Sequence, residues 1–339
     1  MPEPAGDLSA FLIDRLHRPV HALPAPPPAD DPLSGDDAQL FLYLCYELHY
    51  RGLPGVDEAW EWEPTLLAAR ARIEADFDAA VRELVGPPEA PRLPVVEELH
   101  RVTNGNGGPS LSRHMLERGT LEQFREFAVH RSAYQLKEAD PHSWGIPRLC
   151  GRAKSALVKI QSDEYGGGRP GQSHAELFAA TMAAMGLDPT YGAYLGRLPG
   201  TTLATTNLIS YFGLHRRWRG ALIGHLAAFE MTSVEPMSRY ARAAQRFRLP
   251  PDATRFYDVH VVADVHHGAL AATDLAGGLA DAEPALAGDI LFGARALIGI
   301  EERFADRLLR SWAGGRSSLR PAARGGHEGG SVLAALDRS

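Results

Sequence analysis

The feature that most constrains this fold is a polar face on one predicted helix. Residues 257–270, YDVHVVADVHHGAL, place His260, Asp264 and His267 in an otherwise apolar stretch. A helical residue advances by about 100°, so steps of four and then three bring these side chains to nearly one direction. Two imidazoles and a carboxylate on one helix face are typical of metal sites inside bundles, although a solvated polar stripe has the same spacing. A metal site would need further ligands from other helices.

Most of the remaining sequence also favours helix. Residues 120–140 begin with a Thr-x-x-Gln capping box and end before a proline, and residues 147–166 begin with a proline and end in glycine. Convincing alternating strand patterns are absent from the sequence. The further helical candidates are residues 36–52, 56–86, 172–187, 201–212, 214–232, 236–247, 252–272 and 282–312. The sequence therefore predicts an all-α helical bundle.

Irregular segments divide the chain. Residues 20–35 are rich in proline, which is typical of an extended linker. A second irregular stretch covers residues 86–110, and the segment from residue 314 lacks the apolar content of a packed core, which predicts disorder. The predicted division is an N-terminal segment with its linker, N-terminal helices packed on the core, the core domain and a disordered tail: residues 1–35, 36–110, 111–313 and 314–339.

Composition excludes several classes of function. The 339 residues are 45% hydrophobic, enough to bury a large core. A formal net charge of -7 argues against nucleic acid as the main partner. Neither a secretory signal nor an apolar run of the roughly 18 residues needed to cross a bilayer is found, and two cysteines cannot build a disulfide framework. We therefore expect a cytoplasmic protein.

Glu164 and His174 flank a glycine-rich break between two predicted helices. An unbroken helix would turn the two side chains about 80° apart. The run of three glycines at residues 166–168 and Pro170 lie between them and make an unbroken helix unfavourable. The break allows both side chains to aim at one point. The alternative is an exposed loop in which they serve only as end charges.

Two further glutamates are candidate ligands. Glu230 follows an apolar helical stretch and has no basic residue one turn away on either side. If it is buried, it needs a cation or several hydrogen-bond donors; the alternative is that it emerges into solvent. Glu138 alone is an ordinary charge near a predicted helix C-terminus, where the helix dipole slightly disfavours a carboxylate.

Three blocks of the sequence resemble the haem-oxygenase-like diiron oxidases, a family often known only as iron-containing redox enzymes and one that includes N-oxygenases. The blocks are PRLCGRAKSALVKIQSDEYGGGRPGQSHAELF, RGALIGHLAAFEMTS and HVVADVHH, and the resemblance covers residues 120–272. It implies a haem-oxygenase-like helical bundle, here with additional N-terminal helices.

The resemblance also implies a set of iron ligands. One iron site would draw on Glu164, His174 and Glu230, and the second on His260, Asp264 and His267. In one relative an additional glutamate from an earlier helix joins the site, and Glu138 stands at the matching position. Such mixed nitrogen and oxygen ligands suit iron and offer no thiolate for zinc or a cluster. With four carboxylates, two Fe(II) ions would leave the buried site near neutral.

The resemblance implies an oxidase or oxygenase in which two Fe(II) ions use O₂ as co-substrate, while the protein supplies ligands, orientation and exclusion of water. The implied substrate is an amino acid or an amine derived from one, in specialised metabolite biosynthesis. N-oxygenation and C–H desaturation are both known in the family, and C–C cleavage or ring formation is an alternative. We expect an external electron donor and neither a nucleic acid nor a membrane as partner; a homodimer stays open.

Substrate contacts are harder to predict. Within the basic cluster HRRWRG, residues 215–220, Arg216 or Arg219 could bind a carboxylate through two hydrogen bonds. A solvated helix start, or pairing with surface acids, is the alternative. Tyr257 is a candidate pocket residue, although such aromatics more often pack in a core. A non-catalytic iron-binding protein, a metal-free bundle and a mononuclear or cofactorless oxidase of this fold also stay open, and metal stoichiometry distinguishes them.

Overall fold

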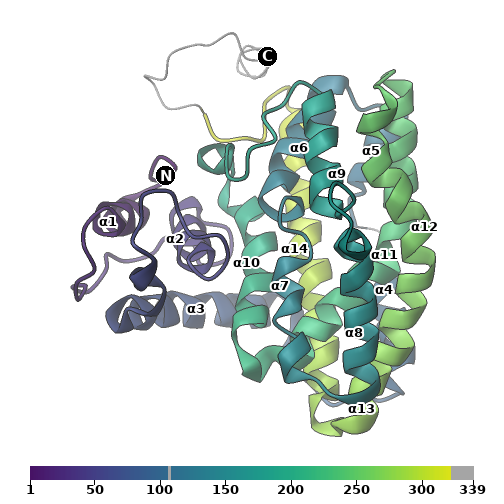
Figure 1. The fold of residues 1–339 in the computed structure, drawn as a ribbon, viewed down its shortest axis with the longest axis horizontal. Coiled ribbons are helices and arrows are strands. Elements are labelled where there is room, and N and C mark those ends of the chain that lie inside the picture. Colours follow the sequence, from purple (N-terminus) through teal and green to yellow (C-terminus); the bar gives the residue numbers. More distant parts are fainter. Residues whose placement is uncertain (106–107, 322–339) are drawn as a thin grey trace.

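The computed structural model describes residues 1–105 and 108–321. Every regular element within them is helical, and those residues include no strand. Residues 1–85, here called the N-terminal layer, lie beside a larger helical bundle (Figure 1). The layer contains α1 (Asp7–Leu16), α2 (Asp36–Glu47) and α3 (Pro64–Val85). The predicted all-α fold is confirmed.

The bundle is organised around α11 (Arg219–Arg246), which packs against α12 (Arg255–Leu270) and α14 (Ala287–Ala313). A Cβ atom at Gly224 of α11 would overlap the carbonyl group of Ile290 on α14, so glycine permits this close approach. The other long helices of the bundle are α6 (Leu121–Gln135), α8 (Gly151–Glu164), α9 (His174–Ala184) and α10 (Gly200–Leu214). Short helices complete it: α4 (Val95–Thr103), α5 (Leu111–Glu117), α7 (Asp140–Ser143) and α13 (Gly278–Ala282), the last preceded by a π-helical segment, Ala271–Gly277.

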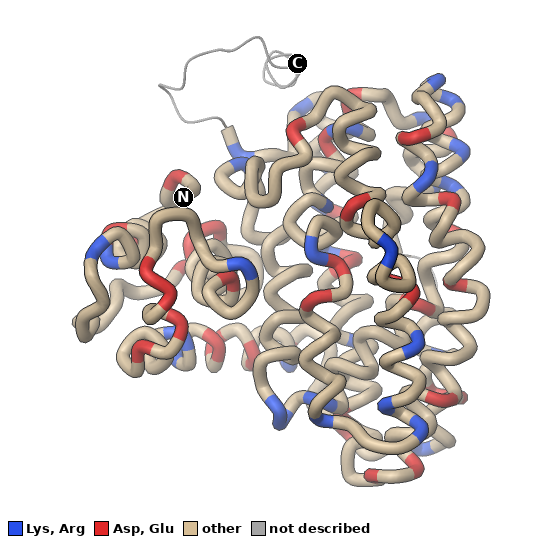
Figure 2. The backbone as a smooth tube through the Cα atoms, viewed as in Figure 1, with Lys and Arg blue, Asp and Glu red and all other residues tan. Residues whose placement is uncertain are grey.

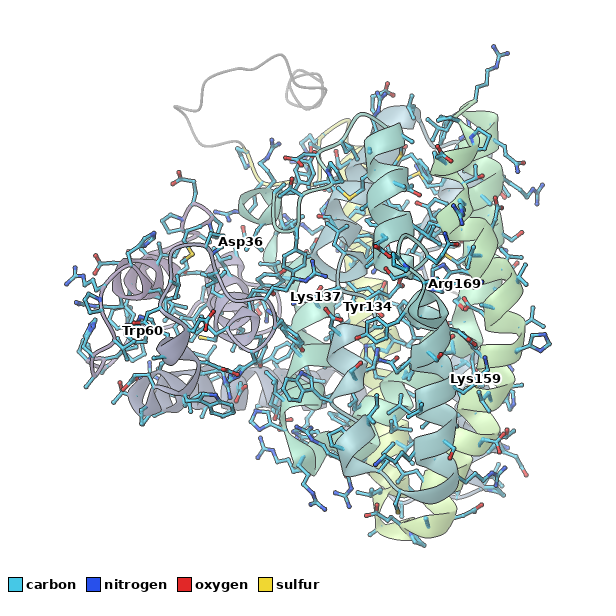
Figure 3. The ribbon with its side chains drawn as sticks, viewed as in Figure 1. Asp36, Trp60, Tyr134, Lys137, Lys159 and Arg169 are labelled. Atoms are coloured by element: carbon cyan, nitrogen blue, oxygen red, sulfur yellow. The ribbon has the colours of Figure 1, made fainter. Side chains whose placement is uncertain are left out.

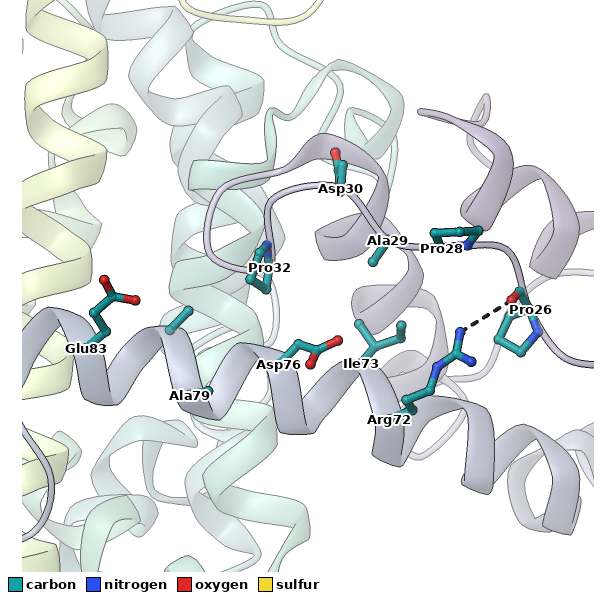
Figure 4. A pocket seen from close by; sticks show the side chains of 11 residues that line it. Pro26, Pro28, Ala29, Asp30, Pro32, Arg72, Ile73, Asp76, Ala79 and Glu83 are labelled. Carbon is teal, nitrogen blue, oxygen red and sulfur yellow. Dashed lines mark hydrogen bonds between the residues drawn. The ribbon is translucent and has the colours of Figure 1, made fainter.

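Buried hydrogen bonds hold the N-terminal layer together. The Asp37 carboxylate accepts bonds of 2.8 and 2.7 Å from the backbone N–H groups of Leu8 and Ser9, which joins α1 to α2. The proline-rich segment, residues 20–35, is extended and runs along α3, where Arg72 donates to the carbonyl of Pro26. Figure 4 shows the groove of about 650 Å³ between this segment and α3. The segment is therefore part of the layer.

Three predicted ranges need correction. Residues 214–232 and 236–247 are not separate helices, because α11 continues through Pro236. A proline inside a helix costs about 3 kcal/mol, and the packing of α11 between α12 and α14 outweighs that cost. The stretch 86–110, predicted to be irregular, contains α4, whose Val95 and Leu99 are buried.

The predicted disordered tail begins with a packed segment. Ser318 is buried, and both its backbone N–H and its hydroxyl donate to the carboxylate of Glu126 on α6. Because Glu126 is itself buried and needs these donors, residues 314–321 lie against the bundle. The rest of the predicted tail, residues 322–339, lies outside the described residues.

Charges are interspersed over the described part of the chain. Figure 2 shows basic and acidic residues scattered over both the layer and the bundle. No helix among the described residues combines the length and the apolar character that a bilayer crossing requires.

Candidate metal centre

The seven predicted ligands come from five separate places in the bundle and are all buried. Three of them, His260, Asp264 and His267, lie on the inward face of α12, while Val262 and Val265 on its other side are 72% and 58% exposed. The polar face of this helix is therefore its buried face. The remaining four are Glu138 in the turn after α6, Glu164 at the end of α8, His174 at the start of α9 and Glu230 within α11.

The glycine-rich break returns the chain so that α9 begins beside the end of α8. Gly166 has φ 66°, and a Cβ atom there would collide with the backbone of Gln172. Ser173 then caps α9 through a reciprocal capping box with Glu176. As a result, His174 Nδ1 lies 2.7 Å from Glu164 Oε2. The alternative of an exposed loop is wrong for both side chains.

Four side chains form a first group. The ligand atoms of Glu138, Glu164, His174 and His260 all lie within 4.8 Å of one another. Within this group, His260 Nε2 is 3.6 Å from Glu138 Oε1. His260 Nδ1 bonds at 2.7 Å to the carbonyl of Phe256, which fixes the ring and leaves Nε2 facing the group.

A second group shares Glu164 with the first. Glu164, Glu230 and His267 place their ligand atoms within 4.8 Å of one another. His267 Nδ1 lies 3.7 Å from Glu164 Oε1, 3.6 Å from Glu230 Oε2 and 3.8 Å from Asp264 Oδ1. His267 Nε2 bonds to Asp163 at 3.0 Å, so that Nδ1 is the atom turned inward.

The two oxygens of Glu164 thus face different groups: Oε2 faces His174 in the first group and Oε1 faces His267 in the second. This arrangement differs from the partition that the resemblance implied. His260 lies with Glu164 and His174, and Glu230 lies with His267. The sequence could not reveal this, because the partition depends on how α11 and α12 pack against α8.

The donor set fits a metal. Among the described residues, both carboxylate oxygens of Glu138 and of Asp264, and Nδ1 of His174 and of His267, are buried without a hydrogen-bond partner. Buried polar atoms left in this state carry a desolvation penalty of about 1–3 kcal/mol each, more when charged. Divalent cations among these atoms would remove that penalty, with imidazole and carboxylate ligands that suit iron.

The electrostatics of the metal-free protein reflect the crowding of these groups. Burial raises the pKa of Glu164 to about 7 and of Asp264 to about 6, and it also raises the pKa of Glu230. Burial alone would lower the pKa of His260, but the neighbouring carboxylates, Glu138 foremost, outweigh it and raise that pKa to about 10. Carboxylates likewise outweigh burial at His267 and raise its pKa to about 9.

His174 differs from the other two imidazoles. Burial, followed by the charge of His260, lowers the pKa of His174 to about 4. It is therefore neutral at pH 7, the form in which an imidazole binds a metal.

One small cavity lies among the ligands and a larger one lies next to it. A void of about 10 Å³, room for about one water molecule, lies among the ligands. A larger cavity of about 390 Å³ lies between α5, α6, α11, α12 and α14. Phe229 lines both and forms a shared wall. The larger cavity contains the Arg131–Glu301 pair, joined by bonds of 2.8 and 2.6 Å.

The predicted substrate residues lie in different places. Tyr257 is buried and lines the larger cavity. Arg216 is exposed. Arg219 is the first residue of α11, about 16 Å along the helix from Glu230, and pairs with Glu283. Neither arginine lines the two cavities beside the ligands.

Sequence reasoning missed several residues that line the void, among them Tyr134, His142 and Gln161. Tyr134 stands four residues before Glu138, and that spacing was the available signal, since side chains four apart on a helix share a face. His142 bonds to His225 at 3.2 Å, and both rings are buried. Nothing local in the sequence joins these two histidines.

Comparison with known proteins agrees with this arrangement. Residues 125–302, more than half of the chain, match the family of iron-containing redox enzymes. The chain belongs to this family. This membership confirms the resemblance found in the sequence and supports an oxidoreductase.

One relative and one solved structure add detail. The chain is 26% identical over 136 residues to the nitrosourea synthase of Streptomyces achromogenes subsp. streptozoticus, which covers 40% of the chain and 29% of the synthase. The chain thus matches less than a third of that relative's length. A CADD-like protein of unknown function from Nostoc punctiforme superposes with a TM-score of 0.52 at 16% identity, covering 64% of this chain and 96% of that one. The shared fold is the helical bundle.

Proposed function

We propose that this protein is a non-haem diiron oxidase or oxygenase that uses O₂ to oxidise a small amino-acid-like molecule. The observation that carries the proposal is the shared position of Glu164, whose two oxygens face two groups of buried ligands. A carboxylate that faces both groups is suited to bridging two ions. A mononuclear site would leave the atoms of one group without a partner.

The ligands divide between the two ions. Glu138, His174 and His260 would hold one ion and Glu230, Asp264 and His267 the other, with Glu164 between them. Bound iron would supply the O₂ chemistry, which no side chain can provide. Four carboxylates against two Fe(II) ions make the buried site near neutral, so the charge costs little to bury.

The protein's own part is binding, orientation and exclusion of water. The 390 Å³ cavity is large enough for a small organic substrate and is separated from the void among the ligands by Phe229, which lines both. The aromatic side chains of Phe127, Tyr240 and Tyr257 line it together with the neutralised Arg131–Glu301 pair. A substrate held there would lie beside the wall that separates this cavity from the metal centre.

The kind of oxidation is proposed from the relative. The relative is named a nitrosourea synthase, and because a nitrosourea carries an oxidised nitrogen, N-oxygenation of an amine derived from an amino acid is our first candidate. C–H desaturation, C–C cleavage or ring formation is the alternative. For N-oxygenation and for C–H desaturation, we expect an external electron donor to restore Fe(II).

Anaerobic titration with Fe(II) tests the proposal. We expect two equivalents per chain, and rapid O₂ consumption when the loaded protein is mixed with air-saturated buffer. Glu164→Gln should lose both equivalents, whereas Glu126→Gln, which changes a buried glutamate bonded to Trp312 and Ser318, should retain them. One equivalent in the wild type, or two in Glu164→Gln, would refute the diiron centre. A panel of amino acids and amines, screened for faster O₂ consumption, then identifies the substrate.

A further inference from the structure

Glu138 is the only one of the seven ligands that lies in a turn between helices. Helix α6 ends at Gln135, residues 136–139 form turns, and α7 begins at Asp140. The regular hydrogen bonds of a helix therefore do not fix its direction. Within the described residues, both of its carboxylate oxygens are buried without a hydrogen-bond partner. Other contacts must hold this turn in place.

The neighbouring residue provides the strongest of these contacts. Lys137 is 1% exposed, and its Nζ donates at 2.8 Å to Oε2 of Glu47, the last residue of α2. The ammonium group also lies 4.7 and 4.3 Å from the ring centres of Tyr43 and Tyr50. Figure 3 shows Lys137 at the boundary between the N-terminal layer and the bundle.

Further contacts hold both sides of the turn. The hydroxyl of Tyr191 donates at 2.7 Å to the same oxygen of Glu47, which fixes the acceptor. Arg51, just beyond α2, donates at 2.9 Å to the carbonyl of Leu136 and lies 3.8 Å from Asp140. The N-terminal layer thus grips the chain before, beside and after Glu138.

We propose that Glu47 and Lys137 form a positioning pair through which the N-terminal layer aims Glu138 at the first group of ligands. The layer, residues 1–85, lies outside the stretch that matches the family, residues 125–302. In this proposal the layer sets the metal affinity of one site from outside the matched stretch. The inference rests on the proposed metal centre.

A purely structural ion pair is the competing explanation, and the two differ in measurable ways. Removing one partner leaves a buried unpaired charge and destabilises the fold, but removing both is often neutral. The double variant Glu47→Gln/Lys137→Met therefore tests positioning without a stranded charge. If the pair is purely structural, the double variant should bind Fe(II) with the affinity of the wild type. If the pair positions Glu138, the double variant should bind Fe(II) more weakly.

The experiment measures Fe(II) affinity anaerobically against a competing chelator, with thermal unfolding in the chelator as a check of the fold. We expect the double variant to melt near the wild-type temperature, to retain one tight equivalent, and to bind the other about 10–100-fold more weakly. Adding Glu138→Ala to the double variant should weaken that equivalent no further, because the pair acts through Glu138. Glu74→Gln is the matched control, since buried Glu74 of the layer forms its ion pairs with Arg70 and His215, away from the turn.

The outcomes separate the two proposals. A wild type that binds fewer than two equivalents refutes the diiron centre itself. A wild type with two equivalents and a folded double variant of equal affinity refutes only the positioning role. An affinity loss of the same size in Glu74→Gln would also refute it, since a general loosening of the layer would then explain both.

Discussion

Replacing Glu164 with glutamine should stabilise the metal-free protein while it removes metal binding. Glu164 is buried, and this burial raises the pKa of its carboxyl to about 7 from an ordinary value of 4.5. Because a tenfold change in a protonation equilibrium is worth roughly 1.4 kcal/mol, burying the group at pH 7 costs about 3 kcal/mol. Glutamine has nearly the same shape and no charge, so the variant is free of this cost.

The effect has a defined pH dependence. Below about pH 4.5 the carboxyl is protonated in both the folded and the unfolded chain, so wild type and variant should differ little. Between pH 4.5 and 7 the unfolded chain releases the proton while the fold retains it, so the wild type loses stability relative to the variant. Above pH 7 the difference is constant.

Thermal unfolding in a chelator at pH 5 and at pH 7.5 measures this difference. We expect Glu164→Gln to melt above the wild type at pH 7.5 by several degrees, since about 1 kcal/mol shifts the melting temperature of a large domain by roughly 2–4 °C. With Fe(II) at a hundred times the dissociation constant of each site, the wild type should gain about 2.7 kcal/mol for each of the two ions, and the variant nothing. The wild type should then be the more stable of the two proteins.

Glu126→Gln provides the control. Its carboxylate accepts bonds from Trp312 and Ser318, so its loss should destabilise the protein equally with and without metal. Should Glu164→Gln lower the stability of the chelated protein at pH 7.5 as Glu126→Gln does, Glu164 would be a structural carboxylate, and the reasoning from the cost of its burial would fail.

Four further outcomes are expected. His260→Ala should abolish one Fe(II) equivalent together with activity, because Nε2 is the ring atom facing the ligands; metal analysis of the purified variant checks this. Glu138→Ala should weaken iron retention less than His260→Ala does. Retention equal to that of the wild type would exclude Glu138 as a ligand. Phe229→Ala should keep two equivalents but release Fe(II) to a chelator faster in stopped-flow mixing, since this ring separates the ligand void from the larger cavity. Burial lowers the pKa of His130 to about 3, so this imidazole should cost the protein about 1.4 kcal/mol of stability for each pH unit below 6.5; the stability of the wild type relative to His130→Asn should fall by that amount in urea unfolding from pH 4 to 8.

The parts of the centre that the sequence predicted are those that local geometry determines. The spacing of His260, Asp264 and His267 defines one face of any helix, whatever packs against it. The glycines between Glu164 and His174 likewise require a turn, and a turn brings its two ends together. Both features need only the arithmetic of a short segment.

The parts that the sequence did not predict depend on packing between distant segments. The assignment of His260 to the group of Glu164 and His174 follows from the approach of α12 to α8 and α9. Arg219 had suitable chemistry for a substrate carboxylate, but its partner is Glu283, which follows α13. Nothing near either residue in the sequence indicates these contacts.

The metal-free centre also explains how four carboxylates can be buried together before iron arrives. With raised pKa values near 10 and 9, His260 and His267 are imidazolium ions at pH 7, and Glu164 with a pKa near 7 is about half protonated. These protons offset part of the carboxylate charge. Two Fe(II) ions would replace them, because an imidazole or carboxylate must lose its proton to bind a metal. The bound protons therefore offset part of the carboxylate charge before metal binds, and protons and metal ions are alternative occupants of one set of side chains.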